Sequence, residues 1–419
     1  MTAAPPAEAS HVAMINVFFA PNTYGGATVV AEEVARHLVT DHGLRVSAIS
    51  AVCRDDLPPY GTVRAETGGI TSWLINLPPG RSAVEGFANP HVADRVTRIL
   101  SQIDPDLVHV HCVQDLGADV IHAARALGLP VILSVHDFWW LCERQFMIRP
   151  DGTWCGQEPI RIEACRGCVD DHGRAVARAG RLSQAGATAD LVTYPSRFAR
   201  DLSEASGFAP GLGAVWENGV RPPGPGFFAA QAARRAADPT PVLGFVGGPS
   251  RIKGWPLVHD AVAGLSRDDL AGVLIDGSRD GSWWRDRDLS ALRGDWRVVP
   301  RYNQAGMDAV WAGIDVLLFT SQWKETFGLT IREALCRGIR VIQTDSGGTM
   351  EHAARDRVAT LAIGDGPDVL RRLIEQALDA PDAHPVPIPV TTQADQARAF
   401  LDLAARVSPV FARSQRAAA

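Results

Sequence analysis

Short apolar runs alternate with amphipathic, helix-forming segments along most of the chain, and the same alternation appears in both halves. The runs lie at residues 13–20, 45–50, 106–111 and 130–137 in the first half, and at residues 241–247, 271–276, 296–301, 315–321 and 340–345 in the second. Continuous apolar runs joined by helices are typical of parallel strands that are covered on both faces. The sequence therefore predicts an α/β fold with two doubly wound, Rossmann-like domains that face each other across a cleft.

The length of the chain also favours two domains, because 419 residues exceed what one hydrophobic core usually holds. The stretch 217–228 is rich in proline and glycine, which is typical of a domain junction. We therefore expect an N-terminal domain over residues 1–216 and a C-terminal domain over residues 217–390. The last segment, 391–419, is rich in alanine and predicts a helix.

Charge and hydropathy exclude several classes of function. The net charge of −6 argues against a nucleic-acid-binding protein, which usually carries a basic face. The sequence predicts no transmembrane helix, because no run approaches 18 uninterrupted apolar residues. The first ten residues lack a basic region followed by an apolar stretch, which argues against secretion. We therefore expect a cytoplasmic protein, in which disulfides are rare.

The stretch "KETFGLTIREAL" carries two carboxylates, Glu325 and Glu333, around a helix start. On one continuous helix, the eight steps between them would span about 12 Å. Glycosidases place their two carboxyl groups about 5–9.5 Å apart, so this spacing argues against a hydrolytic pair. The helix start at Phe327, Gly328 and Leu329 offers free backbone N–H groups that suit a phosphate. The alternative is that Glu325 only places charge at the helix start and that Glu333 is a solvated helix residue.

This stretch resembles the donor motif of the retaining GT-B glycosyltransferases of family 4, the glycosyl transferases group 1. The resemblance rests on the spacing of Glu325 and Glu333, on Thr-Phe-Gly between them, and on the "CRGIRVIQTDSGG" that follows. It implies that Glu325 contacts the hydroxyls of the donor sugar and that Glu333 contacts the ribose of the nucleotide. It also implies that the segment 391–419 packs back on the N-terminal domain.

The resemblance extends to partners and to mechanism. It implies a nucleotide-diphosphate sugar of the UDP or GDP type, and a saccharide or lipid-linked acceptor in cell-envelope polysaccharide or glycolipid biosynthesis. A lipid-linked acceptor would bring the protein to the inner face of the membrane. The leaving phosphate is expected to take the acceptor proton, so that catalysis requires no cofactor and no carboxylate nucleophile.

Two landmarks of the family lie in the first half of the chain. Gly25 and Gly26 follow the first apolar run. They form a tight turn or, as the resemblance implies, lie against the donor diphosphate. His136 ends the run at 130–137. It is a structural hydrogen-bonding residue or, as the resemblance implies, the residue that holds the donor sugar.

Two more landmarks lie in the second half. In "FVGGPSRIKGW", Lys253 matches the family cation that neutralises the diphosphate, but Gly248 stands where the family usually has arginine. We expect Arg251 to replace that arginine. The glycine turn "TDSGGTMEH" at 344–352 is expected to turn its backbone amides toward a phosphate, or else to form a plain β–α turn.

The acceptor side is expected just after His136. Asp137 either orients the histidine or caps the next segment. Adjacent tryptophans are able to stack on sugar faces but more often pack in the core or at its rim. Of the two adjacent pairs in this chain, Trp139 and Trp140 have the better claim to stack on a sugar, because they lie beside His136.

Four of the seven cysteines cluster in a loop at 142–168, namely Cys142, Cys155, Cys165 and Cys168. Two of them form a C-x2-C pair, and four thiols in a short loop are able to bind zinc tetrahedrally. Free thiols and disulfides are the alternatives. A zinc ion here would be structural and would order the acceptor loop.

Two other classes of protein compete with the transferase. A nucleotide-dependent oxidoreductase or epimerase would have G-x-G-x-x-G after its first strand, and "NTYGGATVV" does not supply that pattern. A non-catalytic nucleotide-binding or zinc-dependent scaffold with a decayed site is suggested only by Gly248.

Overall fold

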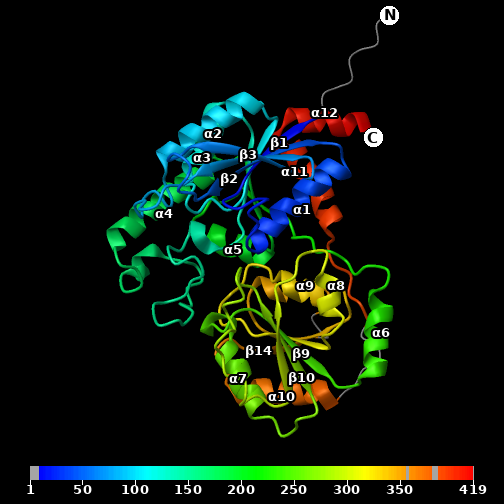
Figure 1. Cartoon of the computed structure of the whole chain (residues 1–419). Helices are drawn as coiled ribbons and strands as arrows, with labels where there is room; N and C mark the ends of the chain where they lie inside the picture. The colour runs from blue at the N-terminus through cyan, green and yellow to red at the C-terminus, as the bar shows by residue number, and fades with distance from the viewer. Residues whose placement is uncertain (1–8, 355–357, 380–385, 419) are drawn as a thin grey trace, which may run out of the picture. The chain divides into compact units, whose positions relative to one another are not determined.

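The computed structural model describes residues 9–354, 358–379 and 386–418 (Figure 1). By its internal contacts the chain divides into two units. Unit 1 comprises the chain up to Gln145, Gln157–Gly219 and the chain from Gln393 onward, and unit 2 comprises Phe146–Gly156 and Val220–Thr392. The main junctions lie close to the expected ones. The short segment Phe146–Gly156 differs from expectation, because it belongs to unit 2 although the sequence places it inside the N-terminal domain.

Unit 1 contains an eight-stranded sheet in the order β3-β4-β2-β1-β5-β6-β7-β8. Its strands are β1 (His11–Ile15), β2 (Arg45–Val52), β3 (Thr62–Thr67), β4 (Ile70–Asn76), β5 (Leu107–Val110), β6 (Val131–Ser134), β7 (Leu191–Tyr194) and β8 (Gly213–Val215). All neighbouring strands are parallel except β3, which pairs antiparallel to β4 at the edge.

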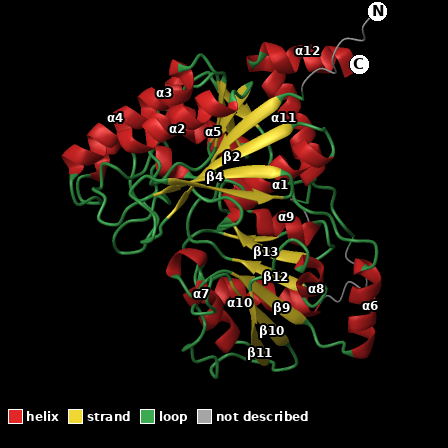
Figure 2. Cartoon of the chain, turned by 45° about the horizontal axis from the view of Figure 1, so that its top comes forward, coloured by secondary structure: helices red, strands yellow, loops and turns green. Residues whose placement is uncertain are grey.

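Helices cover both faces of this sheet (Figure 2). They are α1 (Gly26–Thr40), α2 (Pro90–Ile103), α3 (Asp119–Ala126), α4 (His172–Thr188), α5 (Arg197–Ala205), α11 (Gln393–Val407) and α12 (Pro409–Ala418), with short 3-10 turns η1 (Phe138–Trp140) and η2 (Ile162–Cys165). Strand β1 shows how the two cores form. Ala13 and Ile15 enter the core on one face, while Val12 and Met14 enter the core on the other.

The C-terminal segment returns to unit 1, as expected. Helix α11 lies beside α1 (Figure 1). The ring of Phe400 on α11 stacks on His109, with ring centroids 4.7 Å apart. The indole Nε1 of Trp216 donates a hydrogen bond of 3.1 Å to the backbone oxygen of Gln396. These contacts make α11 part of the core of unit 1.

Unit 2 contains a wholly parallel six-stranded sheet in the order β11-β10-β9-β12-β13-β14. Its strands are β9 (Val242–Val246), β10 (Ala271–Asp276), β11 (Asp295–Pro300), β12 (Val316–Phe319), β13 (Arg340–Thr344) and β14 (Ala359–Leu361). Its helices are α6 (Phe227–Ala237), α7 (Trp255–Ala263), α8 (Met307–Trp311), α9 (Leu329–Leu335) and α10 (Pro367–Asp379), with turns η3 (Arg251–Lys253) and η4 (Gly348–Met350). The prediction of two doubly wound α/β domains is confirmed.

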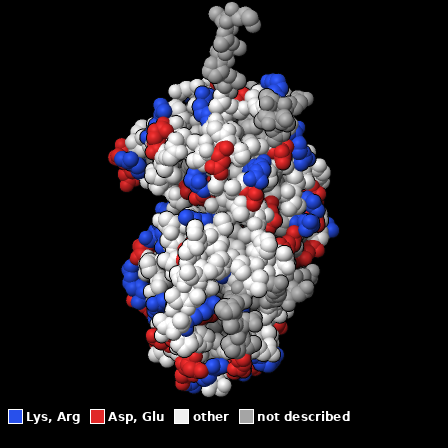
Figure 3. Space-filling model, turned by 90° about the vertical axis from the view of Figure 1, so that its right-hand side faces the viewer, with Lys and Arg blue, Asp and Glu red and all other residues white. Residues whose placement is uncertain are grey.

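The surface agrees with the modest net charge. On the face drawn in Figure 3, basic and acidic side chains are intermixed. Among the described residues, no helix combines the length and the apolar composition that crossing a bilayer requires.

Candidate active site

Lys253 and Glu325, both predicted site residues, form a direct ion pair in unit 2. The Lys253 Nζ lies 2.7 Å from the Glu325 Oε1, and the side chains are 34% and 13% exposed. The Ser321 hydroxyl donates a hydrogen bond of 2.6 Å to the same carboxylate oxygen. Lys253 ends the turn η3 after strand β9, and Glu325 lies in the loop after β12. Because β9 and β12 are parallel neighbours, both loops leave the same edge of the sheet.

Gly254 explains why the two loops approach so closely. Its backbone φ is +80°, and a Cβ at this position would lie 2.1 Å from the backbone oxygen of Thr320. Only glycine combines this conformation with such a contact. The Thr320 hydroxyl in turn donates to the backbone oxygen of Lys253 at 3.1 Å. Lys253 is therefore held against the end of β12 by backbone geometry.

The backbone of Glu325 is fixed from the other side by the loop after β13. The Glu325 N–H donates to the Ser346 oxygen at 3.1 Å, and the Gly348 N–H donates to the Glu325 oxygen at 2.9 Å. The N–H groups of Ser346 and Gly347 also donate within the loop, to the oxygens of Thr344 and Asp345. The expectation that these amides face a phosphate is therefore wrong, because the turn itself uses them.

A buried arginine, Arg332 on α9, ties this loop to the helix. Its guanidinium donates to the backbone oxygens of Phe327, Thr349, Gly348 and Glu351. It also lies 4.1 Å from the ring centroid of Phe327. Sequence reasoning did not identify Arg332, because a helical arginine gives no local sign that it is buried.

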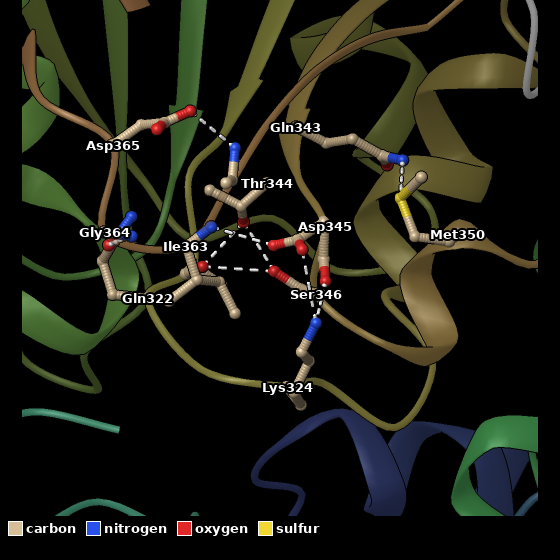
Figure 4. Close-up of polar contacts among 12 residues, drawn as sticks. Gln322, Lys324, Gln343, Thr344, Asp345, Ser346, Met350, Ile363, Gly364 and Asp365 are labelled. Atoms are coloured by element: carbon tan, nitrogen blue, oxygen red, sulfur yellow. Dashed lines mark hydrogen bonds and ion pairs between the residues drawn. The ribbon is translucent and has the colours of Figure 1, made fainter. Parts of the chain in front are cut away.

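Lys324 is a second cation that sequence reasoning missed. Its Nζ donates to the backbone oxygen of Asp345 at 2.7 Å and lies 3.5 Å from the Asp345 carboxylate. The same carboxylate accepts the Ile363 N–H at 2.8 Å. Gln322 accepts the Gly364 N–H at 3.1 Å. Figure 4 shows how these contacts join the loops at the carboxyl ends of β12, β13 and β14.

The predicted helix start is present, and Glu333 is buried on that helix. Gly328 precedes α9 with φ +81°. The Tyr302 hydroxyl donates a hydrogen bond of 3.0 Å to the Glu333 Oε2, and burial raises the pKa of the Glu333 carboxyl. The alternative of a solvated Glu333 is therefore wrong. Leu329 begins α9, whose first N–H groups have no acceptor within the helix. The Phe327 side chain is buried, so only its backbone is available to a ligand.

At Gly248, where the family pattern has arginine, a tryptophan ring covers the backbone. A Cβ at Gly248 would lie 3.1 Å from the ring of Trp283, which covers the position. Arg251, the expected substitute, is exposed, and its Nη1 lies 3.4 Å from the backbone oxygen of Asp151. The assignment of Arg251 to the diphosphate stays a prediction.

In unit 1, His136 follows β6 and is partly exposed at the end of a row of histidines in which His109 and His111 are buried. The His136 Nε2 lies 2.9 Å from the Nδ1 of His111, and the His111 and His109 ring centroids are 4.0 Å apart. Desolvation lowers the pKa of His136 to about 4 and that of His109 to about 3. At neutral pH these rings are uncharged, so one nitrogen of the His111–His136 pair donates and the other accepts.

The remaining residues predicted in unit 1 fall into two groups. Gly25, with φ +83°, directly precedes Gly26 at the start of α1, and both are exposed, so backbone there is open to a ligand. Asp137 caps η1 by accepting the Trp139 N–H at 2.8 Å, which is the capping alternative. Trp139 and Trp140 are 7% and 4% exposed in the hydrophobic core. The expectation that they stack on a sugar is wrong, because a sugar requires an open ring face.

The four clustered cysteines lie in segments that belong to different units. Cys155 belongs to unit 2, while Cys142, Cys165 and Cys168 belong to unit 1. All seven cysteines lie in the described part of the chain and form no disulfide. Within that part, no three His, Cys, Asp or Glu side chains are grouped so as to hold a metal ion. The zinc site stays a prediction, and this arrangement does not support it.

Two family models match the chain. The model of glycosyltransferase family 4 matches residues 24–222, and the model of glycosyl transferases group 1 matches residues 240–380. A GDP-mannose-dependent alpha-mannosyltransferase of Mycolicibacterium smegmatis is 26% identical over 280 residues, or 65% of this chain. The match spans 64% of the length of that relative.

Solved structures share the fold at low sequence identity. Sucrose-phosphate synthase of Thermosynechococcus elongatus has a TM-score of 0.65 and 14% identity, with coverage of 98% of this chain and 100% of its own. Anabaena HepE with UDP and glucose has a TM-score of 0.58 and 19% identity, with 98% of each chain covered. The catalytic domain of Arabidopsis thaliana starch synthase IV, bound to ADP and acarbose, has a TM-score of 0.62 and 14% identity over 95% and 99% of the two chains. Because the family models match both halves of the chain and the fold is GT-B, this protein belongs to the family 4 glycosyltransferases.

Proposed function

We propose that this glycosyltransferase is a retaining enzyme that moves a hexosyl group from a nucleotide-diphosphate sugar to an acceptor hydroxyl. The observation that carries the proposal is the contact of Lys253 with Glu325 at the carboxyl edge of the unit 2 sheet. Doubly wound sheets bind their ligands at this edge. The start of α9 and the buried Glu333 lie on the element that follows Glu325 directly.

Each of these groups has a chemical role that suits its environment. The Lys253 ammonium neutralises the charge that grows on the diphosphate as the bond to the sugar breaks. The Glu325 carboxylate accepts hydrogen bonds from sugar hydroxyls, and Glu333 accepts one from the ribose. Because Lys253 pairs with Glu325 in the free protein, the incoming phosphate must share the ammonium with that carboxylate. Backbone N–H groups at the start of α9, at Gly328 and Leu329, are proposed to add donors for phosphate oxygens.

In the transfer step, the bond between the anomeric carbon and the phosphate oxygen breaks, and the acceptor oxygen bonds to the same face of that carbon. The leaving phosphate takes the acceptor proton, so the step balances without a further base. For neutral His136, we propose that one ring nitrogen holds a sugar hydroxyl while the Nε2 stays hydrogen-bonded to the Nδ1 of His111. This assignment keeps His136, Lys253 and Glu325 as the proposed catalytic residues.

GDP-mannose is the first donor to test, because the relative from Mycolicibacterium smegmatis is named for it. UDP-glucose is the second, because Anabaena HepE binds UDP and glucose. For the acceptor we propose a saccharide or lipid-linked saccharide of cell-envelope polysaccharide or glycolipid biosynthesis. A lipid-linked acceptor would place the protein at the inner face of the membrane.

The test is donor turnover by the wild type and by Lys253→Ala and Glu325→Ala. We expect each variant to release nucleoside diphosphate about 10²–10³ times more slowly, which is typical when a group that stabilises transition-state charge is removed. Glu375→Ala on α10 is the matched control and should keep wild-type turnover. NMR of the product's anomeric proton reports retention or inversion. Wild-type turnover in both site variants would show that the site is assigned wrongly.

A further inference from the structure

The segment Phe146–Gly156 forms a small β-hairpin that belongs to unit 2, although the chain before and after it belongs to unit 1. Ile148 and Trp154 form an antiparallel bridge across it. The Arg149 N–H donates to the Thr153 oxygen at 2.7 Å, so the turn is closed by its own backbone. The hairpin is therefore a defined structural element.

The first residue of the hairpin contacts the site through a tryptophan. The rings of Phe146 and Trp323 meet edge to face, with centroids 5.1 Å apart. The Lys253 Nζ lies 5.7 Å from the centroid of the same Trp323 ring. Trp323 is 4% exposed, so it has little freedom to move once Phe146 is in place. Phe146 thus restrains the lysine that pairs with Glu325.

The far strand and the turn of the hairpin contact two further cations. The Trp154 ring centroid lies 5.5 Å from the Lys324 Nζ. The backbone oxygen of Asp151 lies 3.4 Å from the Arg251 Nη1. The hairpin therefore contacts Lys324 and Arg251 directly, and it reaches Lys253 through Trp323.

Lysine is rare in this chain, and both of its lysines lie close to aromatic rings. Only two of the 41 lysine and arginine residues are lysines, and they are Lys253 and Lys324. Each lies close to an aromatic ring that belongs to the hairpin or touches it. A lysine ammonium sits on a long flexible stem, and an aromatic neighbour restricts the positions it samples. Groups ordered before a ligand arrives bind it more tightly.

We propose that the 146–156 hairpin is a positioning element of the donor site, which orients Lys253 and Lys324 for the diphosphate. The inference rests on the proposed function. Phe146 acts on Lys253 through Trp323, and Trp154 acts on Lys324 directly. The hairpin is thus a part of the donor site that the N-terminal half of the sequence supplies.

The test is to titrate the full chain with GDP, UDP and GDP-mannose in a calorimeter and to measure the Kd of each. Phe146→Ala and Trp154→Ala should each raise the Kd of the nucleotide that the wild type binds by about tenfold. Trp154→Ala removes the ring beside Lys324, and Phe146→Ala removes the ring that supports Trp323 beside Lys253. Phe146→Tyr and Trp154→Phe keep an aromatic ring and should stay within about twofold of the wild type. Phe228→Ala, at an exposed phenylalanine of α6, is the control and should leave the Kd unchanged.

A double-mutant cycle separates positioning from general loss of structure. If Phe146 acts through Lys253, Phe146→Ala should have no further effect on the Kd in the Lys253→Ala background. An equal effect in both backgrounds would overturn the inference, as would wild-type Kd values for Phe146→Ala and Trp154→Ala. If the wild type binds none of the three nucleotides, the proposed function fails and this inference fails with it.

Discussion

Arg332 gives the sharpest test of how the candidate site is held together. Its guanidinium donates to four backbone oxygens, three of which lie in the loop at 348–351. That loop pairs with the backbone of Glu325. Replacing Arg332 by methionine keeps most of the side-chain volume but removes every donor. We expect the variant to lose both stability and the position of Glu325.

The magnitude follows from the hydrogen bonds that are lost. The Gly348 oxygen also accepts the Glu351 N–H at 3.3 Å, so its loss is the smallest. The oxygens of Phe327, Thr349 and Glu351 each lose the hydrogen bond from the guanidinium, and one such bond contributes about 1 kcal/mol. Removing a buried charge returns part of its desolvation penalty, which argues against a larger value for each bond. We therefore expect the free energy of unfolding of unit 2 to fall by about 3 kcal/mol.

Differential scanning calorimetry measures this change. For a domain of about 150–250 residues, 3 kcal/mol corresponds to a decrease in Tm of about 6–12 °C. Arg372→Met, at an exposed position of α10, is the matched control and should change the Tm by less than about 1 °C. A decrease below about 2 °C for Arg332→Met would refute the reasoning, because it would mean that the loop does not depend on these hydrogen bonds.

Four further predictions concern other parts of the molecule. Gly254→Ala should lower the thermal stability of unit 2 and abolish turnover, since its Cβ would meet a backbone oxygen; normal Tm and rate would contradict this. Glu333→Gln should raise the Tm at pH 7.5 and not at pH 4. Because the pKa of the Glu333 carboxyl is higher in the folded protein than in the unfolded chain, this group stabilises the fold below its unfolded-state pKa, and that stabilisation is lost as the pH rises through its folded-state pKa. Conversely, burial lowers the pKa of His136 to about 4 and that of His109 to about 3. When the pH falls from 6.5 to 5, each histidine should therefore lower the free energy of unfolding of unit 1 by about 2 kcal/mol, measured by urea unfolding. Freshly purified protein should contain zinc if the four cysteines bind it, and less than about 0.2 zinc per chain by metal analysis would contradict that prediction.

Much of the fold could be predicted because buried parallel strands leave a local pattern. Strands such as β9 and β10 lie in mainly apolar runs, and their positions agree with the expected ones within a residue. Strand β3 was missed because it is an exposed edge strand without an apolar run. Strand β7 was also missed, although its four residues are all buried.

The site was predicted less completely, because its contacts join residues far apart in the chain. Glu325 and Lys253 were each identified, but the residues around them in the sequence do not indicate that the two side chains form an ion pair. Tyr302, the partner of Glu333, lies in a loop 31 residues earlier and matches no motif. The prediction for Trp139 failed because its side chain is buried in the hydrophobic core. In the sequence, an aromatic residue beside a functional histidine looks the same whether it lies in the core or at the rim of a binding site.

The return of α11 to unit 1 has a consequence for how the protein is made. Unit 1 lacks part of its core until Phe400 is available to pack on His109, and the whole main segment of unit 2 is translated in between. At common rates of synthesis this delay is roughly 10–30 s. During that time the α1 face of the sheet has no α11 to cover it, so the nascent chain would be a natural client for a chaperone. Unit 2, whose main segment is continuous, is able to fold before unit 1 is complete.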